Sequence, residues 1–123
     1  MYGFEYLKKF LREEGYKIRE EEDDHFTFKF QGTTYVAFKN ESPYLQVIVI
    51  CNTEQFPRQE ILEVCNQINK DRYIVKCVAM DGSVWVSYEF LPNETTPGDF
   101  YEFVLSELDS DSDLLFKKLT KEE

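Results

Sequence analysis

The residue types that most often carry chemistry are few in this chain, and their spacing matches no familiar centre. Among 123 residues there are one histidine, His25, and three cysteines, Cys51, Cys65 and Cys77. A nucleophilic triad needs a histidine beside the nucleophile, whereas His25 follows a run of acidic residues. Zinc sites use closely spaced cysteine pairs, and these three cysteines are scattered. We therefore expect no metal centre and interpret the cysteines as reduced, buried, small apolar side chains.

A second candidate centre is the alternating acidic stretch near the end of the chain. Asp109, Asp111 and Asp113 imitate the first three ligands of a calcium-binding loop. Such a loop needs glycine at its sixth position and glutamate at its twelfth, and this chain has Leu114 and Thr120 there. We therefore expect no calcium site.

The remaining signals for an enzyme are also missing. Acidic residues are abundant, but none is expected against an apolar wall that would raise its pKa and prepare it for proton transfer. The five glycines are isolated, so no glycine-rich phosphate loop is present. The sequence predicts neither an enzyme nor a bound cofactor.

Composition and charge limit the partners of this chain. Its length and its hydrophobic content of 42% are typical of one folded domain spanning residues 1–123. A net charge of -10 repels nucleic-acid backbones and anionic lipid surfaces. The longest apolar run, Val47–Cys51, is far below the ~20 residues of a membrane span. We expect a cytoplasmic protein with neither a nucleic-acid nor a membrane partner.

Hydrophobic periodicity predicts three helices and five strands. Apolar residues recur at helical spacing in three segments, and Gly15 and Pro57 are placed to end the first helix and begin the second. Period-two alternation and turn signals indicate the strands. The expected elements are a helix over Tyr2–Glu14, strands over Phe26–Gln31, Thr33–Lys39 and Tyr44–Cys51, a helix over Pro57–Lys70, strands over Tyr73–Met80 and Ser83–Phe90, and a helix from Thr96.

These elements predict an α+β fold of order α-β-β-β-α-β-β-α. We expect an antiparallel sheet of about five strands, with the helices mainly on one face. The strand Tyr44–Cys51 is apolar on both sides, so both of its faces need a cover. Either helices cover both faces of the sheet, or a second subunit covers one of them.

The last helix carries its own expectations. Thr96 is a suitable N-cap, while the acids of 109–113 favour a bend after which the helix resumes. We expect Ser112 to cap a final helical turn. The expected buried stripe consists of Phe100, Phe103, Val104 and Leu108.

Two hairpins determine which side chains share a face of the sheet. The turn at Gln31–Gly32 places Phe26, Phe28, Phe30, Tyr35 and Ala37 on one face. The turn at Asp81–Gly82 places an entirely apolar face, which includes Tyr73, against the helices, and it pairs Ile74 with Glu89. The opposite face mixes polar and apolar side chains, so we expect a partner-binding surface there. The candidate surface residues are Val36, Phe38, Val78, Met80 and Trp85.

Several short motifs resemble the YbjN-like family, which shares the fold of type III secretion chaperones. They include Asn66-Gln67-Ile68-Asn69 with Arg72 and Lys76 after it, the Asp81-Gly82 turn, Glu14-Gly15-Tyr16-Lys17, and the segment from Phe28 to Tyr35. The resemblance covers nearly the whole chain. It implies a non-enzymatic and often dimeric α+β domain, without catalytic residues, in a family described loosely as sensory or regulatory. Chaperones of this fold are small, acidic and wrapped by an extended client segment.

The leading hypothesis is therefore a protein-binding module, either chaperone-like or a regulatory adaptor, that forms a homodimer and binds a protein partner or client segment. The alternative is a small-molecule or peptide sensor domain with a pocket between helix and sheet. An open apolar face distinguishes the first hypothesis, and a cavity with converging polar groups distinguishes the second.

Overall fold

The computed structural model describes residues 4–39, 44–90 and 100–121, with the side chains of 100–102 excepted. The predicted α-β-β-β-α-β-β-α order is confirmed, with a short π-helical segment leading into the last helix. The elements are α1 (Phe4–Glu13), β1 (His25–Phe30), β2 (Thr33–Lys39), β3 (Leu45–Asn52), α2 (Arg58–Asp71), β4 (Val75–Ala79), β5 (Ser83–Phe90), η2 (Phe100–Leu105) and α4 (Ser106–Thr120).

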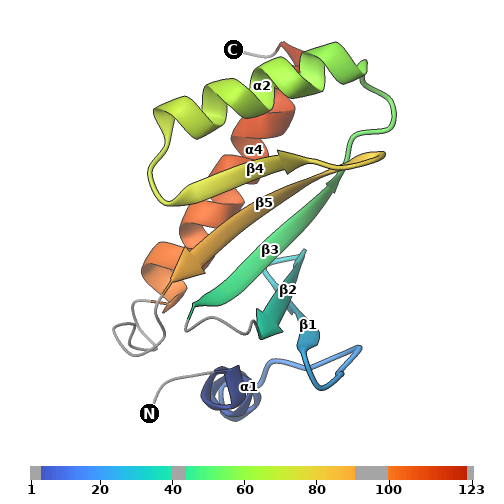
Figure 1. The fold of residues 1–123 in the computed structure, drawn as a ribbon. Helices are drawn as coiled ribbons and strands as arrows, with labels where there is room; N and C mark the ends of the chain where they lie inside the picture. Colours follow the sequence, from blue (N-terminus) through green and yellow to red (C-terminus); the bar gives the residue numbers. More distant parts are fainter. Residues whose placement is uncertain (1–3, 40–43, 91–99, 122–123) are drawn as a thin grey trace.

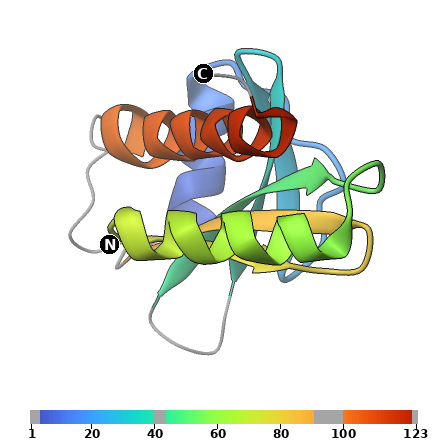
Figure 2. The same ribbon diagram turned by 90° about the horizontal axis from the view of Figure 1, so that it is seen from above.

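The five strands form one antiparallel sheet of order β1-β2-β3-β5-β4. The three α-helices of the described residues pack on one face of it: α2 and α4 lie side by side over β3, β4 and β5, and α1 covers the β1–β2 end (Figures 1 and 2). One cluster of buried side chains joins these layers, from Leu11 of α1 through Phe28 and Val47 of the sheet to Leu115 of α4. The sheet therefore has a helix-covered face and an opposite face, called here the open face.

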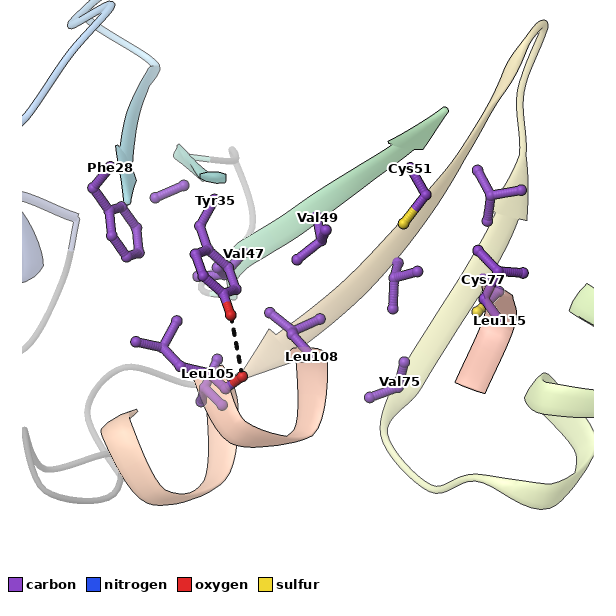
Figure 3. Close-up of a cluster of buried hydrophobic side chains, with 14 of the residues drawn as sticks. Phe28, Tyr35, Val47, Val49, Cys51, Val75, Cys77, Leu105, Leu108 and Leu115 are labelled. Atoms are coloured by element: carbon purple, nitrogen blue, oxygen red, sulfur yellow. Dashed lines mark hydrogen bonds between the residues drawn. The ribbon is translucent and has the colours of Figure 1, made fainter. Parts of the chain in front are cut away.

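Tyr35 is fully buried at the centre of the cluster, and its polar end requires a partner. Its hydroxyl donates to the backbone carbonyl of Leu105, 3.4 Å away, where η2 ends and α4 begins (Figure 3). The expected burial of the three cysteines is also confirmed. Burial raises the pKa of Cys51 and of Cys77 to about 12, so these thiols stay protonated and behave as apolar groups.

The predicted hairpin registers are confirmed in their central parts. Phe28 pairs with Tyr35 across the first turn, and Val78 pairs with Trp85 across the second. In the first turn Gln31 and Gly32 both adopt positive φ angles, 50° and 83°. A two-residue turn with these angles matches the twist of the two strands that it joins.

The prediction for the start of the second hairpin was wrong. Strand β4 begins only at Val75, so Ile74 does not pair with Glu89, and Tyr73 is 88% exposed instead of facing the helices. Ile74 has a φ of 72°, and the amide of Val75 donates to the carbonyl of Tyr73 at 2.8 Å, which closes a γ-turn. The tight turn ends the strand pairing because it takes Ile74 out of the extended conformation.

The last helix also differs from expectation. Phe103 is 56% exposed, although Val104 and Leu108 are buried as predicted. Helix α4 continues through the acidic stretch without a break, and the Ser112 hydroxyl donates back to the carbonyl of Asp109 instead of capping a final turn. The predicted N-cap at Thr96 lies outside the described residues.

Side chains and loops occupy the two edges of the sheet. On edge strand β4, the Asn69 amide donates to the carbonyl of Cys77 at 3.0 Å and accepts from its N–H at 2.7 Å. On edge strand β1, Arg19 exchanges two backbone hydrogen bonds with Thr27. The central backbone groups of both edges are thus already paired, which protects the sheet against strand addition there.

Asn69 should contribute measurably to stability through this edge contact. We expect Asn69→Ala to lower the free energy of unfolding by about 1–3 kcal/mol, because it leaves a partly buried N–H and C=O of Cys77 without partners. Urea denaturation monitored by circular dichroism measures this. Asn66→Ala is the control, since Asn66 is exposed on the same helix, and a similar loss in both variants would contradict the role of the edge contact.

Candidate partner-binding surface

The open face of the sheet is built from the side chains that alternate with the core residues. On β3 these are Gln46, Ile48 and Ile50, because Val47 and Val49 point to the helices. The pairing register places Val36 and Ser87 on either side of Ile48 in the same row. Cross-strand neighbours in an antiparallel sheet share a face, so this row crosses the middle of the open face.

Two aromatic rings cover the middle of the open face. Phe38 is paired with Gln46 and Trp85 is paired with Ile50, so their backbones lie on opposite sides of Ile48 along β3. Their rings nevertheless stack, with centroids 6.2 Å apart and planes within 18°. The stack must therefore pass over Ile48, which explains why Ile48 is completely buried although no described helix packs on this face.

All five predicted surface residues lie on the open face or at its rim, but their exposure differs. Val36 is buried beside Ile48, and Phe38 and Trp85 are half-buried in the stack. Val78 and Met80 are exposed. The aromatic pair thus forms a small second core, and the accessible apolar area lies beside it over β4 and the end of β3.

The sequence analysis missed the contribution of β3 to this surface. Ile50 is 48% exposed and pairs with Trp85, which in turn pairs with Val78, so the three side chains form one row across β3, β5 and β4. The signal was present, because Ile48 and Ile50 alternate with Val47 and Val49, but only the two hairpins were placed in register. We call Ile50, Val78, Met80, Phe38 and Trp85 the apolar patch.

Polar pairs border the apolar patch. Lys76 and Glu89 form a salt bridge with Nζ and Oε1 2.6 Å apart, and Gln46 donates through its amide to the Ser87 hydroxyl at 2.9 Å. Both pairs lie on the open face, next to the Phe38–Trp85 stack. An apolar centre with paired polar groups at its border has the composition of a protein interface.

One buried carboxyl on the other side of the molecule corrects a prediction. Asp111 of α4 is fully buried, and its Oδ1 lies 3.3 Å from Nε of Arg72, at the end of α2. Neither carboxylate oxygen has a hydrogen bond among the described residues, so the pair has ion-pair distance without hydrogen-bond geometry. Burial and the neighbouring Glu107 carboxyl raise the pKa of Asp111 to about 6, against the opposing Arg72.

The Asp111 cluster is better explained as a contact between helices than as a reactive centre. Asp111 lies in the regular helix α4, and Arg72 adjoins the α2 end that contacts α4. Within the described residues, no group of three histidine, cysteine or acidic side chains is arranged to hold a metal ion. None of the described helices is long and apolar enough to cross a bilayer.

Comparison with known proteins places the chain in a family and a fold. The model of the YbjN family, described as "Putative bacterial sensory transduction regulator", matches residues 4–104. A crystal structure of an uncharacterized protein from Methanothermobacter thermautotrophicus is similar with a TM-score of 0.57 at 12% identity, covering 95% of this chain and 91% of that one. This second similarity concerns the fold alone. No curated protein matches the chain significantly.

The raised pKa of Asp111 makes a pH-dependent prediction. Between about pH 4 and pH 6 the folded state keeps a proton that the unfolded chain has released, so Asp111 lowers the free energy of unfolding as pH rises through this window. Asp111→Asn should therefore stabilise the protein by on the order of 1–3 kcal/mol at pH 7.5 and by much less at pH 4.

Urea denaturation at the two pH values measures this difference. Asp113→Asn is the control, because it removes the same charge from an exposed position on the same helix. If Asp111→Asn changed the free energy of unfolding equally at both pH values, the pKa of the Asp111 carboxyl would not be raised in the folded protein.

Proposed function

The chain belongs to the YbjN family, and we propose that it is a non-enzymatic protein-binding module, a regulatory adaptor that forms a homodimer through its open face. The observation that carries the proposal is the apolar patch. A stacked Phe–Trp pair and three exposed aliphatic or thioether side chains lie together on a sheet face that no described helix covers. Clustered aromatic and methionine side chains are enriched at protein interfaces.

The closed edges of the sheet support the same mode of binding. A partner that added a strand would need free backbone groups, but Cys77 on one edge and Thr27 on the other are already bonded. Side-chain contact across the open face requires no rearrangement of these bonds. We therefore favour face-to-face packing over strand addition.

A second copy of the chain suits this face electrostatically. A twofold axis through the open face brings the same surface of both subunits together. Each side chain then meets either its own copy or the copy of a neighbouring side chain, and these contacts must not bring like charges together. The bordering Lys76–Glu89 pair contains both charges, so Lys76 of one subunit can pair with Glu89 of the other, and the reverse. The apolar patch itself carries no charge that would repel its copy.

Other partners fall within the same proposal. A client segment would have to be apolar, and basic flanking residues would favour its approach to a chain of net charge -10. The three unpaired, buried cysteines fit a reducing compartment such as the cytoplasm. The family description as a regulator is compatible with an adaptor of this kind.

Ile50 offers the sharpest test of the open face, because Trp85 also covers Ile48 and its loss would disturb the fold. We expect Ile50→Gln to weaken self-association by at least about tenfold, since Ile50 is the most exposed side chain of the apolar patch. Sedimentation velocity over a range of concentrations measures the dimer dissociation constant.

Leu62→Gln is the matched control for this test. Leu62 is 43% exposed, a fraction similar to the 48% of Ile50. It lies on α2, on the helix-covered side of the sheet. It should leave association unchanged within about twofold, because a rim or distant contact contributes little. Equal effects of both substitutions, or none from Ile50→Gln in a protein that does dimerise, would place the interface elsewhere.

A further inference from the structure

A depression of about 380 Å³ lies at the end of the molecule opposite the γ-turn of Ile74, where strand β3 leads into α2. Its walls are the loop after β3, the first turn of α2 and the β4–β5 turn. Two hydrogen bonds fix these walls: Thr53 N–H to the Gly82 carbonyl at 3.2 Å, and Arg58 Nη1 to the Met80 carbonyl at 3.1 Å. The depression is therefore already formed in the free protein, and its volume suits a small molecule.

One wall is electropositive. Helix α2 begins after Pro57 without a side-chain cap, and its first hydrogen bond between backbone groups is from Ile61 to Pro57. The preceding N–H groups of the first turn thus have no partner within the helix. Arg58 occupies the first helical position, where the helix dipole disfavours a cation. Arg58 and the helix start together favour an anionic group in the depression.

Two acidic side chains belong to the same lining. Glu54 and Asp81 line the same depression, and no basic side chain of the described chain lies within salt-bridge distance of either. A Cβ atom placed on Gly82 would lie 3.3 Å from the Glu54 side chain, so Glu54 packs directly against the β4–β5 turn. These two carboxylates favour a cationic group.

A polar and an apolar feature complete the lining. Thr53 is only 1% exposed, and its hydroxyl has no hydrogen-bond partner among the described residues. Buried hydroxyl groups are normally paired, so this one points to a missing partner. Phe56 and Met80 supply apolar surface to the same depression.

The charges of the lining select the class of ligand. A simple anion such as phosphate would face Glu54 and Asp81, and a simple cation would face Arg58 and the start of α2. A molecule that carries both charges can pair with Arg58 and with the two acidic side chains. We propose that this depression binds a small zwitterion with an apolar side chain, of the class of free apolar α-amino acids, with its carboxylate toward Arg58 and its ammonium toward Glu54 and Asp81.

Ligand titration followed by nuclear magnetic resonance tests this proposal. The probes are L-leucine, L-methionine and L-phenylalanine, together with leucinamide, which lacks the carboxylate, and 4-methylpentanoate, which lacks the ammonium. We expect saturable shifts of the backbone amides around Thr53, Arg58 and Gly82 with at least one amino acid, and binding weaker by at least about tenfold for both truncated analogues. No saturation with any amino acid, or equal binding of the analogues, would overturn the proposal.

Charge-deleting variants locate the site. Arg58→Gln and Glu54→Gln should each weaken binding by at least about fivefold, because each removes one of the two charge contacts. Lys70→Gln, at the far end of α2, and Glu22→Gln, in an exposed loop, are the charge-matched controls and should bind as the wild type does. Binding that Arg58→Gln and Glu54→Gln leave unchanged would place the ligand elsewhere and contradict the proposal.

Discussion

The central strand β3 carries apolar side chains on both of its faces, and the rest of the structure depends on how each face is covered. On one side Val47 and Val49 pack under the helices, in the core that Leu11, Phe28 and Leu115 share. On the other side Ile48 is buried by a Phe38–Trp85 stack that crosses it. This second cover is thin and leaves Ile50 exposed. A sheet with a complete core on one face and a partial one on the other has a natural place for a partner.

Contacts at the end of helix α2 close the β4 edge of the sheet to strand addition and join α2 to α4. Asn69 bonds both backbone groups of Cys77, so the β4 edge cannot pair there with another strand. Arg72 then reaches the buried Asp111 of α4, which joins the two helices that cover this part of the sheet. The segment that resembled the family motif thus has a structural role: its side chains fix an edge of the sheet and a helix pair, and none of these contacts involves the open face.

Much of the fold follows from the sequence because its signals are local. Alternation in β1 and β2 and the Asp81–Gly82 turn were sufficient to predict the central strand pairing of both hairpins and the faces of the residues in it. The errors arose where tertiary contacts decide. The γ-turn at Ile74 has no turn residue to reveal it, and Asp111 is buried where α4 meets Arg72, which is distant from it in sequence. The five candidate residues were assigned to the correct face of the sheet, but the stack of Phe38 on Trp85 was not predicted, because it joins strands that do not pair with each other.

Trp85 is the single tryptophan of the chain and lies in the apolar patch, so its fluorescence reports directly on the open face. Acrylamide quenching can be measured across a dilution series while light scattering follows the molar mass. If the open face is the interface, quenching should decrease and the emission should shift to shorter wavelength as the protein dimerises. A protein that doubles its mass while Trp85 remains equally accessible to acrylamide would contradict the account.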